Sequence, residues 1–253
     1  MFLWWILFFL ILFLVLLLLS QTPRPIGKTR SVSVPVPAKP SKKADAFTKI
    51  YKNRWWGNQH PNGPGSWIEN TQQDQQAIHD VLTRYEIRTM LDVPCGTLSW
   101  LSHVLQHHPE VSYTGMDIVE EQVQENQKAF PWHRFLHGDM SKTSFQQYDL
   151  VFSKEGTQHM TREDTLRFLK AVRASGSKYL LCTSYDLPRN DETIIDTTHE
   201  IHSLEEGAYR EQDFTKPPYS DVLTSPPIER YFIRYAIAAQ HTPQYLLLFS
   251  LQS

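Results

Sequence analysis

The sequence predicts an α/β fold in which a mostly parallel sheet carries helices on both faces. Short apolar runs that suit buried strands alternate with segments whose apolar residues recur at helical spacing. This alternation is typical of a doubly wound sheet with right-handed crossovers. Polar residues also follow four of the predicted strands directly, and ligands of such sheets lie beyond the carboxyl ends of the strands. We therefore expect a small polar ligand at that edge of the sheet.

The first strand, turn and helix begin within residues 89–101, which read TMLDVPCGTLSWL. The apolar strand breaks at Pro94-Cys95-Gly96, where Gly96 allows the backbone to approach a ligand closely. Asp92, at the strand end, offers an acceptor for an ammonium or hydroxyl group. The helix that follows carries apolar residues on one side: Leu98, Leu101, Val104 and Leu105.

The following strands end in residues that suit a nucleoside. A second strand at 111–118 contains Asp117, 21 residues after Gly96, where a carboxylate can accept both hydroxyls of a ribose. Later strands are predicted at 134–136, 148–153, 178–183 and 244–251. The first two of these are followed by the polar sequences HGDM and KEGTQHM.

Two helices and a loop are expected ahead of the first strand. A short helix at 46–51 leads into a Gly/Pro/Asn loop that ends near Ser66. Trp55-Trp56 is either the hinge of a lid or part of the core, and we favour the core. Thr71 and Asp74 resemble a capping box that opens a helix with one apolar face.

Two segments are expected after the fourth strand. The spacing of apolar residues predicts a helix over 162–175. The polar, Pro-containing stretch 188–227 is expected to be a long loop over the strand ends, where residues usually select the substrate.

The four strand-end motifs, in this order, resemble those of class I S-adenosylmethionine-dependent methyltransferases. LDVPCG resembles the first motif of that family, GMDIV its ribose-binding motif and HGDM its adenine-binding motif. YDLVFSKEGTQHM resembles the motif that faces the methyl group, and the resemblance covers residues 47–251. WGNQHPNGPGS, PCG followed by a Trp, and EEGAYREQDFTKPPY further resemble a bacterial and invertebrate subgroup often linked to sugar or glycan methylation.

The resemblance implies a Rossmann-like fold and S-adenosylmethionine as cofactor. Its sheet is mostly parallel and seven-stranded, and the last strand lies antiparallel beside the fifth. The cofactor-binding residues that it implies follow strands one to four: Asp92, Pro94, Cys95, Gly96, Asp117, Ile118, Asp139, Met140 and Lys154.

Methyl transfer to a hydroxyl requires alignment, exclusion of water and removal of a proton. His159 is the first candidate for the base, because it follows the fourth strand by six residues and histidine accepts protons near neutral pH. An equally weighted alternative is that His159 caps the helix that starts near Thr161. Glu155 is the second candidate base; it can instead orient His159 or bind a substrate hydroxyl.

Three functions remain open. The first is O-methylation of a carbohydrate, either a sugar nucleotide or a glycan. The second is methylation of a lipid or another small molecule. The third is an inactive cofactor-binding scaffold, because Pro94 and Leu98 stand where the first motif commonly has glycines. A nicotinamide dehydrogenase is disfavoured, because the first turn lacks GxGxxG.

The amino terminus predicts a membrane anchor. Residues 2–19 are 18 consecutive apolar residues, long enough to span a bilayer, with no basic segment before them and no small-residue cleavage site after them. We favour a retained single-pass anchor over residues 1–20, then a basic Pro/Ser-rich linker over 21–43 and the methyltransferase domain over 44–253. A cleaved signal peptide is the alternative.

The charge distribution disfavours a nucleic-acid substrate. The segment from Gln21 to Arg54 contains nine basic residues and one acidic residue. The rest of the chain contains 16 basic and 26 acidic residues. The basic flank can contact anionic lipid head groups, and an acidic domain is a poor match for phosphate backbones. The positive-inside rule favours a domain on the cytosolic side of the membrane. By contrast, the order of anchor, stem and catalytic domain resembles that of Golgi carbohydrate enzymes. We expect an endomembrane location in the Golgi or the endoplasmic reticulum, on either face.

Neither the cysteines nor the histidine pair predicts a further site. Cys95 and Cys182 end strands that are not expected to be neighbours, so a disulfide between them is disfavoured. His199 and His202 form HxxH without a clear third ligand, so no metal site is assigned.

Overall fold

The computed structural model describes residues 41–57, 61–191, 207–235 and 242–252. Contacts divide the chain into Met1–Val36 and Pro37–Ser253, and every described residue belongs to the second unit. The anchor expected at residues 2–19 lies outside the described residues, and so does the linker up to residue 40. Among the helices of the described ranges, none is both long and apolar enough to cross a bilayer.

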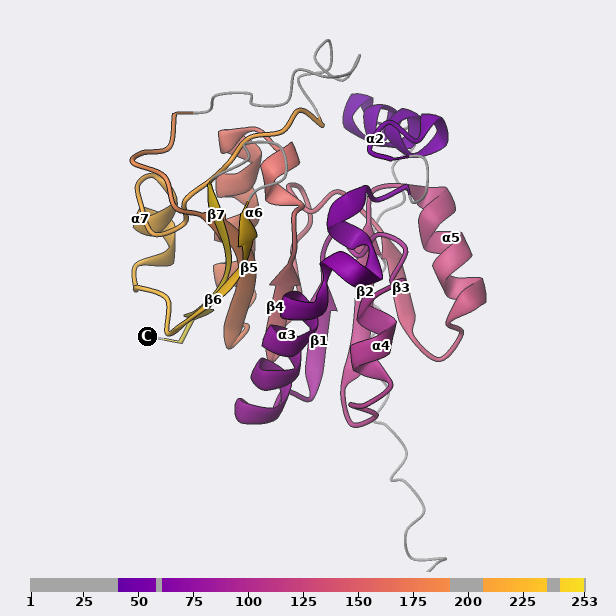
Figure 1. Cartoon of the computed structure of the whole chain (residues 1–253), viewed down its shortest axis with the longest axis horizontal. Coiled ribbons are helices and arrows are strands. Elements are labelled where there is room, and N and C mark those ends of the chain that lie inside the picture. The colour runs from indigo at the N-terminus through magenta and orange to yellow at the C-terminus, as the bar shows by residue number, and fades with distance from the viewer. Residues whose placement is uncertain (1–40, 58–60, 192–206, 236–241, 253) are drawn as a thin grey trace, which may run out of the picture. The chain divides into compact units, whose positions relative to one another are not determined.

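A seven-stranded sheet forms the centre of the fold, in the order β3-β2-β1-β4-β5-β7-β6 (Figure 1). Neighbouring strands among β1 to β5 pair in parallel, whereas β7 pairs antiparallel with both β5 and β6. The strands are β1 (Thr89–Asp92), β2 (Ser112–Asp117), β3 (Arg134–His137), β4 (Leu150–Ser153), β5 (Tyr179–Tyr185), β6 (Glu229–Tyr235) and β7 (Pro243–Ser250). The predicted sheet, with its antiparallel strand beside the fifth, is therefore confirmed.

Helices cover both faces of this sheet. They are α2 (Lys42–Asn53), α3 (Gln72–Arg84), α4 (Leu101–Leu105), α5 (Glu120–Ala129), α6 (Arg162–Ala174) and α7 (Tyr219–Leu223). Short 3-10 turns occur at Pro64–Ser66, Ile68–Asn70 and Thr157–His159. Of these elements, α2 contributes to the cavity at the carboxyl ends of the strands rather than to either apolar face.

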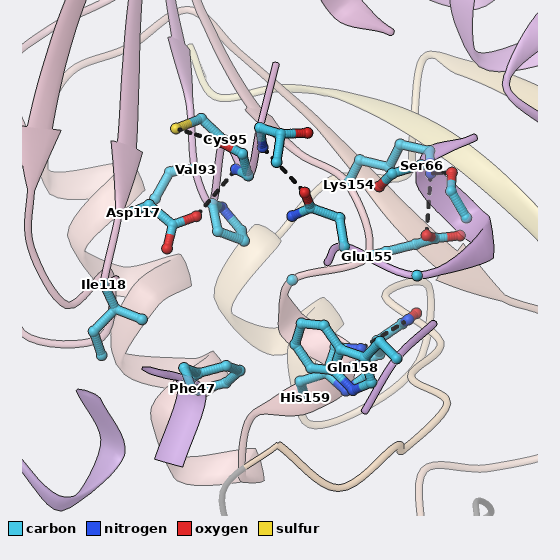
Figure 2. A pocket seen from close by; sticks show the side chains of 18 of the residues that line it. Phe47, Ser66, Val93, Cys95, Asp117, Ile118, Lys154, Glu155, Gln158 and His159 are labelled. Atoms are coloured by element: carbon cyan, nitrogen blue, oxygen red, sulfur yellow. Dashed lines mark hydrogen bonds and ion pairs between the residues drawn. The ribbon is translucent and has the colours of Figure 1, made fainter. Parts of the chain in front are cut away.

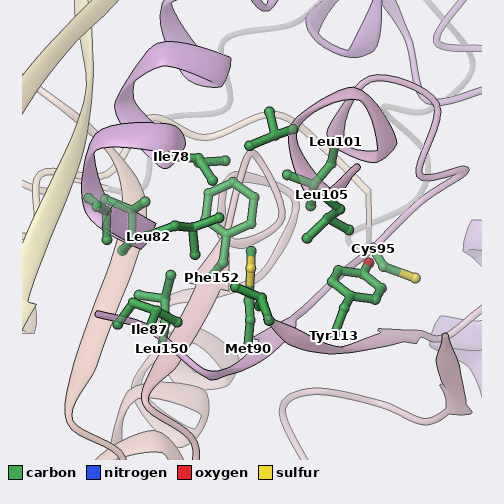
Figure 3. Close-up of a cluster of buried hydrophobic side chains, with 14 of the residues drawn as sticks. Ile78, Leu82, Ile87, Met90, Cys95, Leu101, Leu105, Tyr113, Leu150 and Phe152 are labelled. Atoms are coloured by element: carbon green, nitrogen blue, oxygen red, sulfur yellow. The ribbon is translucent and has the colours of Figure 1, made fainter. Parts of the chain in front are cut away.

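Two apolar cores, one on each face, explain why the strands read as continuous apolar runs. Met90 and Phe152 belong to the core under α3, α4 and α5 (Figure 3), whereas Leu91 and Val151 belong to the core under α6 and α7. Successive strand residues point to opposite faces, so a strand covered on both sides must be apolar at each position. The burial of β4 at all four positions agrees with this.

Several local predictions were wrong, for identifiable reasons. Asp74 does not complete a capping box: Thr71 makes no side-chain cap bond, and the Asp74 carboxylate pairs with Arg234 of β6 at 2.7 Å. The linker expected up to residue 43 ends earlier, because α2 begins at Lys42 and buries Lys43. β6 was not predicted, and α7 lies inside the stretch expected to be a loop.

Candidate active site

A cavity of about 500 Å³ opens at the carboxyl ends of β1, β2 and β4. The loops that follow β1 to β4 form one part of its wall. The other part consists of α2, residues 62–66, residues 207 and 209, and Gln244 of β7. All eleven residues predicted for the site line this cavity: Asp92, Pro94, Cys95, Gly96, Asp117, Ile118, Asp139, Met140, Lys154, Glu155 and His159. The arrangement is that of a ligand site at the strand ends of an open α/β sheet.

The turn after β1 is bound to the end of β2. Gly96 has φ of 52°, the left-handed region that glycine adopts without strain, and its N–H donates to Asp117 Oδ2 at 3.0 Å. Asp117 Oδ1 accepts from the N–H of Val119 at 3.0 Å. Each oxygen of Asp117 thus has one backbone donor and one remaining acceptor direction. Figure 2 shows this carboxylate beside Val93 and Cys95.

Asp92 is a buried carboxyl group at the end of β1, with 3 % of its surface exposed. Tyr113 donates its hydroxyl proton to Asp92 Oδ2 at 2.8 Å. Burial raises the pKa of Asp92 to about 8, even though the Tyr113 hydrogen bond acts in the opposite direction. Below that pH, without ligand, the group is neutral and can donate a hydrogen bond into the cavity.

Asp139 follows β3 and has one oxygen that accepts no hydrogen bond from the described residues. Its Oδ1 accepts from the N–H and the hydroxyl of Ser141, at 2.9 and 2.7 Å. Its Oδ2 is buried and accepts no hydrogen bond from the described residues, although the ammonium groups of Lys142 and Lys43 lie 3.5 and 3.7 Å away. A buried acceptor without a donor costs free energy, so this atom fits an N–H group of a bound ligand.

Residues 90–175 match the family model described as a methyltransferase domain. The chain therefore contains a class I methyltransferase domain. No curated protein matches the chain. The methyltransferase domain of bacterial CtHen1 is similar in structure, with a TM-score of 0.54 and 14 % identity over 72 % of this chain and 99 % of that one. Magnesium protoporphyrin IX methyltransferase from Synechocystis PCC 6803 with bound S-adenosylmethionine gives a TM-score of 0.53 and 13 % identity over 85 % and 100 %. At these identities the likeness concerns the fold.

The residues of this methyltransferase domain fit S-adenosylmethionine as its cofactor. Asp117 has two acceptor directions for the ribose hydroxyls, and Asp139 Oδ2, which accepts no hydrogen bond from the described residues, fits the adenine amino group. Ile118 and Phe47 face the same space in Figure 2 and provide apolar walls for a flat base. When bound, the cofactor supplies a methyl group on a sulfonium, which is electrophilic without further activation.

Lys154 and Glu155, directly after β4, belong to a network of buried charges. Lys154 pairs with Glu155 at 3.1 Å and donates to the carbonyl of Gly65 at 2.8 Å. Gln244 donates to Glu155 Oε1 at 2.8 Å. Burial raises the pKa of Glu155, but Lys154 and Arg234 outweigh it and hold the pKa at about 2. A carboxylate of that pKa is a poor proton acceptor at neutral pH, which argues against Glu155 as the base.

His159 has a fixed tautomer in its neutral form. Its Nδ1 lies 3.0 Å from the carbonyl oxygen of Gly207, which can only accept, so Nδ1 carries the proton and Nε2 is the acceptor. The Gln158 amide nitrogen lies 3.4 Å from Nε2. The hydroxyl of Tyr185 donates to Gln158 Oε1 and orients that amide. His159 does not cap α6, because Thr161 does so by accepting from the N–H of Asp164.

Helix α2 forms a cover over the cavity, held by a buried lysine. Lys43 is 6 % exposed, and its ammonium pairs with Asp164, lies 3.7 Å from Asp139 and donates to Ser141 at 2.9 Å. These partners belong to α6 and to the turn after β3. The cover is therefore bound to the same turn that presents Asp139 to the cavity.

The loop after α2 reaches the turn after β1. Tyr51 accepts from the Asn62 amide at 2.5 Å, and Asn62 Oδ1 accepts from the N–H of Thr97 at 3.2 Å. A Cβ built on Gly96 would lie 2.3 Å from the Asn62 amide nitrogen. Asn62 thus packs directly against Gly96 and Thr97 in the turn after β1.

Trp55 and Trp56 are half-buried and line the cavity, so the prediction that they belong to the core was wrong. The Trp56 ring stacks on the His159 imidazole with ring centroids 4.5 Å apart. The Tyr209 ring contacts the same imidazole edge-on, with centroids 5.9 Å apart. Sequence reasoning also missed Lys43 and Asn62, because their partners are distant in the chain and no local pattern marks them.

Cys95 and Cys182 are free, buried thiols. HxxH at 199–202 lies outside the described residues. Within the ranges that the structure describes, no three histidine, cysteine or acidic side chains are grouped to hold a metal ion.

Proposed function

We propose that this S-adenosylmethionine-dependent methyltransferase transfers the methyl group to a hydroxyl oxygen of a carbohydrate, with His159 as the base. The observation that carries the proposal is the tautomer of His159. Its Nδ1 proton is committed to the carbonyl of Gly207, which makes Nε2, 3.4 Å from the Gln158 amide nitrogen, the nitrogen that accepts a proton, and His159 lines the cavity. A base in this place is needed for a hydroxyl acceptor.

The proposed step balances in atoms and charge. The acceptor oxygen forms a bond to the methyl carbon while the bond from that carbon to sulfur breaks, so the sulfonium becomes a neutral thioether. The hydroxyl proton passes to His159 Nε2, and the resulting imidazolium holds the positive charge that the sulfonium has lost. Gly207 stabilises the imidazolium by accepting from Nδ1 at 3.0 Å.

The aromatic side chains around His159 support a sugar ring as the acceptor. Trp56 and Tyr209 flank the imidazole, and the faces of aromatic rings pack well against the C–H faces of sugars. Gln158 and Gln244 line the same cavity and supply amide groups for hydroxyls. Together they form an apolar wall with polar groups beside it, as small-molecule sites require.

The proposal includes attachment to an endomembrane through residues 2–19, on the grounds of their apolar run. Alkaline carbonate extraction of a membrane fraction tests this part. The expected result is that the full chain stays in the pellet, and its release into the supernatant would contradict attachment by a spanning segment.

The test of the activity offers methyl-labelled S-adenosylmethionine and the full chain to glycans, sugar nucleotides and lipid extracts in parallel. Label in a carbohydrate fraction that survives alkaline hydrolysis, as an ether does and an ester does not, is the expected result. Label in the lipid fraction alone would overturn the carbohydrate as acceptor. Binding of the cofactor without transfer to any acceptor would instead favour an inactive scaffold.

A further inference from the structure

The positive charges of the cavity wall are already neutralised by neighbouring carboxylates. Among the described lining residues, the only basic side chains apart from His159 are those of Lys43 and Lys154. Lys43 pairs with Asp164 and lies 3.7 Å from Asp139. Lys154 lies 3.1 Å from Glu155 and 3.8 Å from Asp74, with 6 % of its side chain exposed. Neither ammonium group is available to a new anion without breaking a buried pair.

The backbone N–H groups that could hold a phosphate are also engaged. Anion sites in α/β folds usually use free N–H groups in the turn after the first strand. Here Cys95 donates to the carbonyl of Met116 at 2.8 Å, Gly96 donates to Asp117 at 3.0 Å and Thr97 donates to Asn62 at 3.2 Å. The turn therefore offers a carboxylate to the ligand and no set of free donors.

The internal segments that the structure does not describe add no positive charge in the sequence. Residues 58–60, 192–206 and 236–241 contain neither lysine nor arginine. Residues 192–206 contain five acidic residues and directly precede Gly207, which lines the cavity. Together, these three segments thus carry acidic side chains and no lysine or arginine.

We propose that the acceptor is an uncharged hydroxylated ring, such as a neutral glycan or glycoside, and that sugar nucleotides and sugar phosphates are excluded. This inference rests on the proposed function and selects between the two carbohydrate classes. A phosphate brought into the cavity would lose its water without gaining a cation, which costs several kcal/mol. A neutral sugar meets the Trp56 and Tyr209 rings and the amide groups instead.

The experiment uses the full chain, labelled S-adenosylmethionine and acceptors that share a sugar ring with and without phosphate groups. Methyl glycosides of common hexoses are compared with their 6-phosphates and with the corresponding nucleotide diphosphate sugars, at a pH of about 8 where free histidine is neutral. We expect kcat/KM for the neutral member to exceed that for the charged member by at least about 100-fold, given a penalty of about 3 kcal/mol. A salt series should leave the neutral rate nearly unchanged, because screening acts on charges.

A variant separates charge exclusion from poor fit. Glu155→Gln removes the carboxylate nearest to Lys154 and keeps the side-chain size, so it should lower the preference for the neutral acceptor by about 10-fold. Asp186→Asn, at an exposed carboxylate outside the cavity, should leave the preference unchanged.

Equal or faster transfer to the charged members by the wild-type enzyme would overturn the inference while leaving carbohydrate methylation intact. Transfer to no carbohydrate at all would overturn the proposed function, and the inference with it.

Discussion

His159 is the residue on which the proposed proton transfer depends most. Its ring is fixed from three sides, by the Gly207 carbonyl, by the stacked Trp56 and by Tyr209. Such contacts set both the tautomer and the orientation of the imidazole. A base held in this way needs no rearrangement when the acceptor enters.

Replacement of His159 should therefore affect the rate rather than the binding of the cofactor. We expect His159→Ala to lower kcat by roughly 100-fold to 10,000-fold, the usual contribution of a general base. The dissociation constant for S-adenosylmethionine should change less than about three-fold, within about 0.7 kcal/mol. Steady-state kinetics and calorimetric titration measure the two quantities. His107→Ala, at an exposed histidine, is the matched control, and a fall in kcat of similar size in both variants would refute the role.

The sequence located the lining residues but not the roles of all of them. Asp117 and Asp139 could be predicted because each ends a strand, and strand ends of a parallel sheet converge. The low pKa of Glu155 could not, because Arg234 and Gln244 reach it from β6 and β7, far along the chain. Trp56 was assigned to the core because an apolar pair suits a core and a cavity wall equally well.

Among the elements, α2 is longer than the sequence predicts, and β6 was not predicted at all. The local pattern indicates a short helix, and the structure extends it to 12 residues, with Lys43 inside the first turn. A lysine ahead of an apolar stripe is expected to be exposed to solvent, whereas here Lys43 is buried by its partners on α6 and after β3.

The sheet was easier to predict, because the apolar residues of each buried strand are consecutive in the sequence. β6 was missed because charged residues, namely Glu229, Arg230 and Arg234, interrupt its apolar pattern at the edge of the sheet.

Loss of the Lys43 ammonium should loosen the α2 cover. Lys43→Met removes one of the two cations that pair with the buried Asp164, Arg167 being the other, and should cost roughly 1 to 3 kcal/mol of unfolding free energy. Chemical denaturation measures this change. Lys49→Met, at an exposed position of the same helix, should cost less than about 1 kcal/mol. Equal stability of the two variants would show that the buried pair does not fasten α2.

At the scale of the whole molecule, the buried carboxyl groups make stability depend on pH. The pKa of Asp92 in the folded state is raised to about 8, so this group favours the folded state fully at low pH and loses that effect as the pH rises through about 8. The pKa of Glu155 is lowered to about 2, so its contribution is present above its ordinary pKa and is lost as the pH falls toward about 2. Together, these two groups favour the folded state of the ligand-free protein most at acidic pH, near their ordinary pKa values.

The corresponding prediction concerns the melting temperature without cofactor. Between about pH 5 and about pH 8 the wild-type protein should become less stable, because Asp92 must lose a proton within the fold. Asp92→Asn removes this titration and should flatten the slope over the same range. Differential scanning calorimetry gives both curves. A wild-type melting temperature that rises over this range and is matched by the variant would contradict the raised pKa.

We expect the cavity at the strand ends to bind S-adenosylmethionine through Asp117. Calorimetric titration of the full chain with this cofactor tests it most directly, with Asp117→Ala and the exposed-site variant Asp186→Ala in parallel. Wild type and Asp186→Ala should bind alike, and Asp117→Ala should bind at least about 100-fold more weakly, because two charge-assisted hydrogen bonds are lost. A folded wild-type chain that does not bind the cofactor, or an Asp117→Ala variant that binds as tightly as Asp186→Ala, would contradict the claim.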